Sequence, residues 1–122
     1  WDISRKYAVF NDAEASQLRA IGTEKAQIAV DSQIVVRQFC EKETGIDGFD
    51  LPDPIAMAVA LSDQTIVRSE EASVTVDLTN GATRGMTIID DRNYVKRRKT
   101  TTIVLEADRQ QFVQLLKSAL EK

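Results

Sequence analysis

The first part of the chain contains residues that are suited to begin and to end a short helix. Asn11 or Asp12 can cap a short helix that runs to about Ile21, and Gly22 is placed to end it with a positive φ. The opening residues, Trp1-Asp2-Ile3-Ser4, read like the end of a strand that enters a loop. They indicate a piece of a longer chain, although processing could also create a tryptophan N-terminus.

The next stretch, from Glu24 to about Glu43, contains neither Pro nor Gly and predicts one long helix. Ile28, Val35 and Phe39 fall on one side of it and predict the stripe that faces the core. The other side gathers small and polar residues, and it can be either a solvated face or a face on a cavity. The residues on that side are Ala26, Gln33, Arg37, Cys40 and Thr44.

A glycine-hinged loop leads from this helix to a compact one, expected from Pro54 to about Leu61. Asp53 suits the N-cap of this second helix. Because a proline stands on each side of it, its backbone is restricted and its carboxylate is held at the mouth of the helix. The carboxylate can be a structural cap or a ligand for a hard metal ion. One Asp is too few for Ca²⁺, which takes about six to eight oxygens, so the other ligands would come from elsewhere.

A β region follows. Val74, Val76 and Leu78 alternate with polar residues and predict a half-buried strand, which Asn80-Gly81 can join in a hairpin to a partner around residues 86–89. Residues 101–106 predict one more strand.

The chain closes with a helix. Asp108 and Gln111 predict a capping box at its start, and its apolar residues form one face. Those residues are Phe112, Leu115, Leu116, Ala119 and Leu120. A mixture of helices and strands with a helical majority, in a chain of 122 residues without internal repeats, predicts one domain of the α/β or α+β class.

Composition narrows the possible functions. The net charge of −3 and the pI near 5.0 have the wrong sign for a domain that binds nucleic acid over a broad face. With one cysteine and no histidine, the chain can supply neither an internal disulfide, a Cys/His zinc site nor a histidine-based triad. Oxygen ligands remain, and they favour Ca²⁺ or Mg²⁺. The longest apolar run, Ile55 to Leu61, is too short to span a bilayer, so we expect a folded cytoplasmic protein without a membrane segment.

Three other features have ordinary explanations. The run Lys96-Arg97-Arg98-Lys99, with Arg92 and Tyr94 nearby, is typical of a solvated loop rather than of a nucleic-acid site. The Thr83-Arg84-Gly85 turn can hold a phosphate or carboxylate, although an ordinary hairpin loop explains it as well. Cys40 lacks an activating base and is expected to be a small buried thiol.

Several short stretches follow one another in a defined order. They are Trp1-Asp2-Ile3-Ser4, Leu18-Arg19-Ala20-Ile21-Gly22-Thr23, Gly45-Ile46-Asp47-Gly48, Leu51-Pro52-Asp53-Pro54-Ile55-Ala56, Thr83-Arg84-Gly85-Met86-Thr87, and Val104-Leu105-Glu106-Ala107-Asp108 with Phe112. Each is weak alone, but the order and spacing resemble the C-terminal part of the inosine-uridine preferring nucleoside hydrolases over nearly all of the chain.

The resemblance implies an α/β fold with a mainly parallel central sheet, and an enzyme that uses bound Ca²⁺ to hydrolyse the N-glycosidic bond of ribonucleosides. It implies that Asp53 is a calcium ligand. Pro52 stands where well-studied relatives carry a histidine that helps to protonate the leaving base, so leaving-group activation must differ. Cys40 and Thr44 fall where pyrimidine-preferring relatives place base-contacting side chains. Gln33 and Arg37 share that face, and we expect all four to lie near the substrate.

The family's aspartate-rich motif, Asp-x-Asp-x-Gly-x-Asp-Asp, does not occur in these residues. The resemblance therefore implies that residues 1–122 form the C-terminal part of one nucleoside hydrolase domain, inactive alone and completed by an N-terminal portion. The complete enzyme is expected to form homodimers or homotetramers. A non-catalytic α/β ligand-binding or interaction module on the same scaffold is the alternative, favoured by Pro52 and by the missing aspartates.

Overall fold

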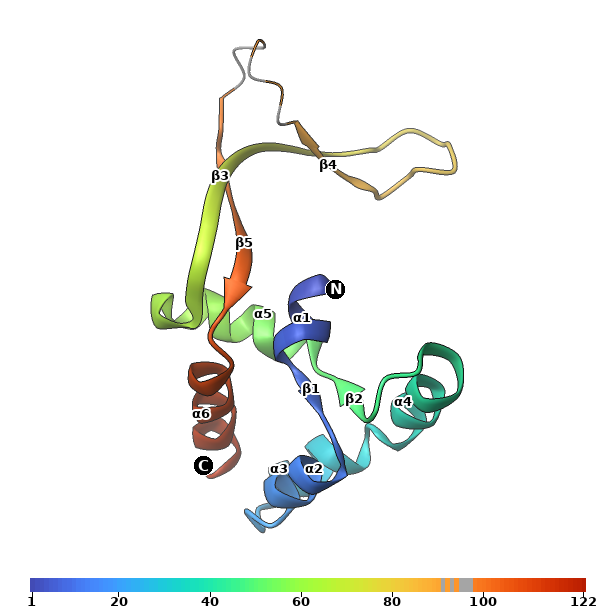
Figure 1. Ribbon diagram of the computed structural model, residues 1–122, viewed down its shortest axis with the longest axis vertical. Coiled ribbons are helices and arrows are strands. Elements are labelled where there is room, and N and C mark those ends of the chain that lie inside the picture. Colours follow the sequence, from blue (N-terminus) through green and yellow to red (C-terminus); the bar gives the residue numbers. More distant parts are fainter. Residues whose placement is uncertain (91, 93, 95–97) are drawn as a thin grey trace. The chain divides into compact units, whose positions relative to one another are not determined.

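The chain divides into two units, which are described separately (Figure 1). The computed structural model describes residues 1–90, 92, 94 and 98–122. The first unit comprises Trp1–Val67 and Ala107–Lys122, and the second comprises Arg68–Glu106. Lys96 and Arg97 of the basic run lie outside the described residues.

The first unit opens with a helix instead of the expected strand end. Helix α1 spans Asp2–Tyr7, and the Arg5 N–H donates to the Trp1 carbonyl at 2.9 Å. Asp2 stands in its first turn and Arg5 and Lys6 in its last, so both ends complement the helix dipole. These charges favour a helix over the strand end that was predicted for residues 1–4.

Strand β1 (Val9–Phe10) leads to helix α2 (Asp12–Arg19), which confirms the first predicted helix. The N-cap is Asn11: its side chain accepts from the Glu14 N–H, and the Glu14 carboxylate accepts from the Asn11 N–H. This reciprocal pair is a capping box. Gly22 has a φ of 83°, as expected of a residue that ends a helix.

The single helix predicted over residues 24–43 is wrong. Helix α3 (Glu24–Asp31) and helix α4 (Ile34–Phe39) are separate, and a π-helical segment (Cys40–Thr44) follows α4. At the break the Ser32 hydroxyl turns back to the Ala29 carbonyl, and the Gln33 N–H bonds to the Val30 carbonyl three residues earlier. Serine competes for helix carbonyls in this way and bends helices.

The side of this segment that faces the core is also the opposite of the one predicted. Ile28, Val35 and Phe39 are 61%, 74% and 58% exposed, whereas Ala26 and Cys40 are buried. Small side chains allow this backbone to approach the rest of the unit closely. The periodicity therefore located two faces correctly but assigned the core to the wrong one.

Three phenylalanines lie at the centre of the first unit. Strand β2 (Phe49–Asp50) pairs antiparallel with β1, with Phe10 opposite Phe49. The Phe10 ring stacks on Phe49 at 6.2 Å and meets the edge of Phe112 at 6.0 Å. Helix α5 (Pro52–Leu61) and helix α6 (Arg109–Leu120) pack on each other around this cluster. Phe112 and Leu120 of the predicted apolar face are buried, as expected.

Asp108 caps α6, but the predicted box is only half formed. Its carboxylate accepts from the N–H groups of Gln110 and Gln111. The N–H of Asp108 itself donates to the Thr65 carbonyl at 2.9 Å, in a short 3₁₀ turn (Asp63–Thr65), and so is not available to Gln111.

The second unit contains the predicted hairpin. Strand β3 (Ile66–Val76) enters it and pairs antiparallel with β4 (Thr87–Asp90), with Val76 opposite Thr87. Strand β5 (Thr101–Ala107) lies on the other side of β3, in the order β4-β3-β5. Leu78 lies beyond the end of β3 and is exposed. The mixture of helices and strands matches the predicted α/β or α+β class. The two strand pairs β1–β2 and β3–β4 are antiparallel.

Among the residues that the structure describes, no helix is long and apolar enough to cross a membrane.

Candidate functional site

Asp53 stands in the first turn of α5 rather than at its N-cap, so the N-cap prediction was wrong. Pro52 opens the helix, and the cap is Leu51, which offers no side-chain hydrogen bond. Proline is well suited to this first position because its φ is fixed and its missing N–H is not needed there. The Asp53 side chain is exposed at the positive end of the helix, where a carboxylate is stabilised.

The turn that carries Asp53 is fixed by backbone contacts to β1 and to the residue before it. The Leu51 N–H donates to the Ala8 carbonyl at 3.0 Å. Gly48 has a φ of 116°, and a Cβ there would lie 2.0 Å from the Phe10 carbonyl oxygen. A residue with a side chain cannot take this position while β1 and β2 stay paired.

A buried polar pair fixes the same turn to α1. The Ser4 hydroxyl donates to Asp50 Oδ2 at 2.9 Å, and both residues are buried. Sequence reasoning missed Ser4, Asp50 and the close approach at Gly48. The glycine directly before Phe49 was the one available signal, and the pairing of Ser4 with Asp50 gave none because 46 residues separate them.

The four expected substrate-contacting residues lie on the broken segment after α3. Gln33 is half-buried and donates to the Ser32 hydroxyl. Arg37 forms ion pairs with Asp12 and, at 3.1 Å, with Glu41. Cys40 is buried, and the Thr44 hydroxyl donates to the Cys40 carbonyl at 2.8 Å. Cys40 and Thr44 are thus brought together, whereas the Arg37 guanidinium is engaged by two carboxylates.

A small apolar pocket links this segment to the Asp53 turn. Gln33 and Pro54, the residue after Asp53, both line it, and the other lining residues come mainly from α3, β2 and α6. Those residues are Leu18, Ala29, Val30, Ser32, Phe49, Leu51, Leu116 and Leu120. The pocket brings Gln33, but not Arg37, Cys40 or Thr44, to the start of α5.

Asp53 can contribute to a metal site but cannot form one with its neighbours. Within residues 1–90, 92, 94 and 98–122, no three or more His, Cys, Asp or Glu side chains gather closely enough to hold a metal ion. One exposed carboxylate supplies the oxygen type that hard cations prefer, but too few oxygens to complete their coordination.

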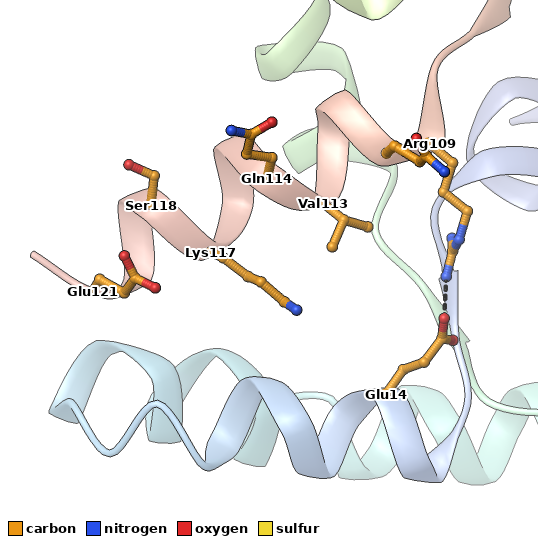
Figure 2. Close-up of a pocket in the computed structure, with 8 residues that line it drawn as sticks. Glu14, Arg109, Val113, Gln114, Lys117, Ser118 and Glu121 are labelled. Atoms are coloured by element: carbon orange, nitrogen blue, oxygen red, sulfur yellow. Dashed lines mark hydrogen bonds and ion pairs between the residues drawn. The ribbon is translucent and has the colours of Figure 1, made fainter.

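A polar groove lies along α6, lined by Glu14, Lys117 and Glu121 among others (Figure 2). At its edge Arg109 donates to Glu14 Oε1 at 2.7 Å and to the Tyr7 carbonyl at 2.8 Å. Burial opposes ionisation of Glu14, but hydrogen bonds from Arg109 and the Asn11 N–H, with the Arg109 charge, outweigh it and lower the Glu14 pKa. The Arg109 guanidinium also lies 5.0 Å from the centre of the Phe10 ring. These contacts join α6 to the N-terminal segment, and sequence reasoning missed them.

The Thr83-Arg84-Gly85 turn is bonded within its own loop. Arg84 Nη1 donates to Asn80 Oδ1 at 2.6 Å, and the Thr83 hydroxyl donates to Asp77. Hydrogen bonds from Thr83 and Thr79 lower the pKa of Asp77. The arrangement is that of an internally bonded hairpin loop.

Comparison with known proteins places the chain in a family. The family model for inosine-uridine preferring nucleoside hydrolases matches residues 1–114. A pyrimidine-specific ribonucleoside hydrolase, RihA, of Klebsiella pneumoniae (strain 342) is 29% identical over 120 residues, which are 98% of this chain and 38% of that protein. The inosine-uridine preferring nucleoside hydrolase of Leishmania major is 28% identical over 115 residues, which are 94% of this chain and 36% of that protein.

Solved structures agree on the fold. A purine-preferring ribonucleoside hydrolase from Gardnerella vaginalis superposes with a TM-score of 0.75 at 22% identity, covering 98% of this chain and 37% of that one. The plant nucleoside hydrolase PpNRh1 gives 0.76 at 18% identity, covering 96% and 38%. The chain thus spans less than two-fifths of the length of these relatives. Its α/β fold is that of the nucleoside hydrolases, and the chain belongs to the inosine-uridine preferring nucleoside hydrolase family.

Proposed function

We propose that this chain forms part of a ribonucleoside hydrolase that cleaves the N-glycosidic bond and releases a base and ribose. The observation that carries the proposal is the family match over residues 1–114, which includes the Asp53 turn. Because the chain spans 38% of its K. pneumoniae relative, the remaining groups of such an active site would come from outside these 122 residues.

Asp53 would be the contribution of this chain to a calcium site. Its exposed carboxylate offers oxygen ligands, and the turn that carries it is fixed by the hydrogen bond from Leu51 to Ala8 and by the close approach of Gly48 to β1. A bound Ca²⁺ would supply charge stabilisation and orient the ribose hydroxyls and a water. A cation beside a helix N-terminus needs several carboxylates to hold it, so this chain alone is expected to bind Ca²⁺ weakly.

The segment from Gln33 to Thr44 would lie toward the base. Its π-helical part, Cys40–Thr44, supports this placement, since π-helical turns are frequent at functional sites. Cys40 offers a compact thiol, and Gln33 offers an amide near the start of α5. Arg37 would act mainly by holding Asp12 and Glu41, because its guanidinium is already paired with both.

Pro52 cannot donate a proton, so protonation of the leaving base would depend on a group outside the first turn of α5. Together with the single carboxylate, this predicts that the isolated chain releases no base from inosine or uridine.

A chimera tests the proposal. In it, this chain replaces the matching segment of the K. pneumoniae relative. Release of the base is measured with a nucleoside substrate, and calcium binding is measured by calorimetry. Asp53→Asn in the chimera should lower turnover more than about a hundredfold and weaken Ca²⁺ binding, since a ligand and its charge are lost. Asp63→Asn, at an exposed carboxylate in the 3₁₀ turn after α5, is the matched control and should change neither. Unchanged calcium binding by the Asp53→Asn chimera contradicts the assignment.

An interaction module without catalysis is the second candidate. The exposed apolar side chains of α3 and α4 favour it, because Val35 and Phe39 offer a contact surface. A chimera that binds nucleosides or a partner but never releases base, even with Asp53 intact, would support this candidate.

A further inference from the structure

The loop between β3 and β4 is held in one conformation by hydrogen bonds around Asp77. Its carboxylate accepts from the Thr79 N–H at 2.8 Å and from the Thr79 and Thr83 hydroxyls. Its backbone bonds across to the returning arm, since the Asp77 N–H donates to the Met86 carbonyl and the Asp77 carbonyl accepts from the Gly85 N–H. The residues between Asp77 and Gly85 are exposed, and these hydrogen bonds restrict the conformations that they can take.

Asn80 and Gly81 stand at the exposed tip of this loop. The Arg84 guanidinium donates to Asn80 Oδ1 at 2.6 Å, and the Arg84 N–H donates to the Gly81 carbonyl at 3.2 Å. Among the described residues, the Gly81 N–H itself donates to no backbone carbonyl. An exposed asparagine is thus followed by a glycine whose N–H has no backbone acceptor, and the guanidinium of Arg84 donates to the amide oxygen of that asparagine.

We propose that Asn80 is a site of deamidation in the folded protein and that Arg84 accelerates the reaction. The Gly81 nitrogen loses its proton and attacks Cγ of Asn80, so that an N–C bond forms. The bond from Cγ to Nδ2 breaks, and ammonia leaves with the proton. Water then opens the five-membered imide at either carbonyl and gives aspartate or isoaspartate. Water is the only co-reactant.

Arg84 contributes to the first step. When the Gly81 nitrogen attacks, negative charge develops on Oδ1, where the guanidinium already donates. A donor placed on a developing oxyanion lowers the barrier because it bonds the transition state more strongly than the ground state. Gly81 contributes by having no side chain to shield its nitrogen.

The modification changes the charge of the loop tip. A neutral amide becomes a carboxylate beside Arg84, so the hydrogen bond becomes an ion pair. The net charge of the chain moves one unit below −3. The isoaspartate product also adds a backbone atom between residues 80 and 81, in a loop closed by the hydrogen bonds of Asp77.

The test follows the mass of loop peptides after the 122-residue chain has been kept near neutral pH. Deamidation replaces NH₂ by OH, and fragmentation that cleaves Cα–Cβ bonds separates isoaspartate from aspartate. Asn80 should convert much faster than Asn11, whose side chain caps α2. Gly81→Ala should slow the conversion severalfold. This variant fits the loop, because the added Cβ would meet its neighbours at 3.7 and 3.9 Å, which is ordinary contact.

Arg84→Gln tests the accelerating role and should slow conversion by about tenfold, the effect of losing a charged hydrogen bond from the transition state. In urea, where the loop is unfolded, the parent and the Arg84→Gln variant should convert at equal rates. The proposal is overturned if Asn80 stays intact in the folded chain over a time in which it converts in urea. The role of Arg84 is overturned if the folded parent and Arg84→Gln convert equally fast.

Discussion

Ser4 and Asp50 form a buried hydrogen bond, 2.9 Å long, between the first helix and the strand that leads into the Asp53 turn. A buried carboxylate without a partner loses its solvation without compensation. The position of the candidate metal ligand therefore depends on a serine far from it in the sequence.

Ser4→Ala should lower the free energy of unfolding by about 1–3 kcal/mol, because the Asp50 carboxylate loses its buried partner. Urea unfolding followed by circular dichroism measures the change. Ser16→Ala, on the exposed side of α2, is the matched control and should change stability by less than about 0.5 kcal/mol. Equal effects of the two substitutions would contradict the role of the pair.

Glu14→Gln should destabilise the chain at neutral pH by about 1 kcal/mol, since the pair with Arg109 is partly exposed. The pKa of Glu14 is held below its ordinary value, so its contribution is present above that ordinary pKa and is lost as the pH falls through the lowered one. The parent and the variant should therefore become equally stable in acid. Unfolding by urea at a series of pH values measures this convergence, and Glu70→Gln, at an exposed position of β3, should show no such pattern.

Gly48→Ala should unfold the chain or abolish the pairing of β1 and β2, because the new Cβ would collide with the Phe10 carbonyl. Gly45→Ala separates this effect from backbone strain alone. Gly45 has a φ of 68° with nothing within 4 Å of the added Cβ, so its substitution should cost about 1–2 kcal/mol. Thermal unfolding compares the two variants, and a milder effect at Gly48 than at Gly45 would refute the close approach.

Val35→Gln and Phe39→Gln should each leave the free energy of unfolding within about 0.5 kcal/mol of the parent, because both side chains are mostly exposed. Phe112→Ala, at a fully buried ring, should cost about 3–5 kcal/mol. The two surface variants should also reduce self-association in light scattering, since they break an exposed apolar face. A cost at Phe39 equal to that at Phe112 would show that this face is buried.

Structural features that depend only on neighbouring residues were predicted from the sequence. The helix caps at Asn11 and Asp108 and the β3–β4 hairpin all arise within a few residues, and each was predicted from the sequence, although the reciprocal capping box was predicted at Asp108 and formed at Asn11. The start of α5 was predicted two residues too late, because Pro52 itself opens the helix and moves the N-cap to Leu51.

Features that depend on contacts between distant segments could not be predicted from the local sequence. Periodicity divides the 24–43 segment into two faces, but which face is buried depends on what packs against it. Ala26 and Cys40 are buried, while Phe39 is not. The candidate site follows the same rule: Asp53 was visible from its flanking prolines, whereas Ser4, Asp50 and Arg109 gain their roles only when distant segments meet.

The hydrogen bond from the Asp108 N–H to the Thr65 carbonyl closes the first unit at the point where the chain leaves it and returns. Within the second unit, its first and last residues, Arg68 and Glu106, form an ion pair of 2.9 Å. Residues 68–106 thus resemble an insertion whose two ends lie close together. Such a segment can lengthen or shorten while the cap of α6 and the phenylalanine cluster stay unchanged, because the cost of closing a loop rises only slowly with its length.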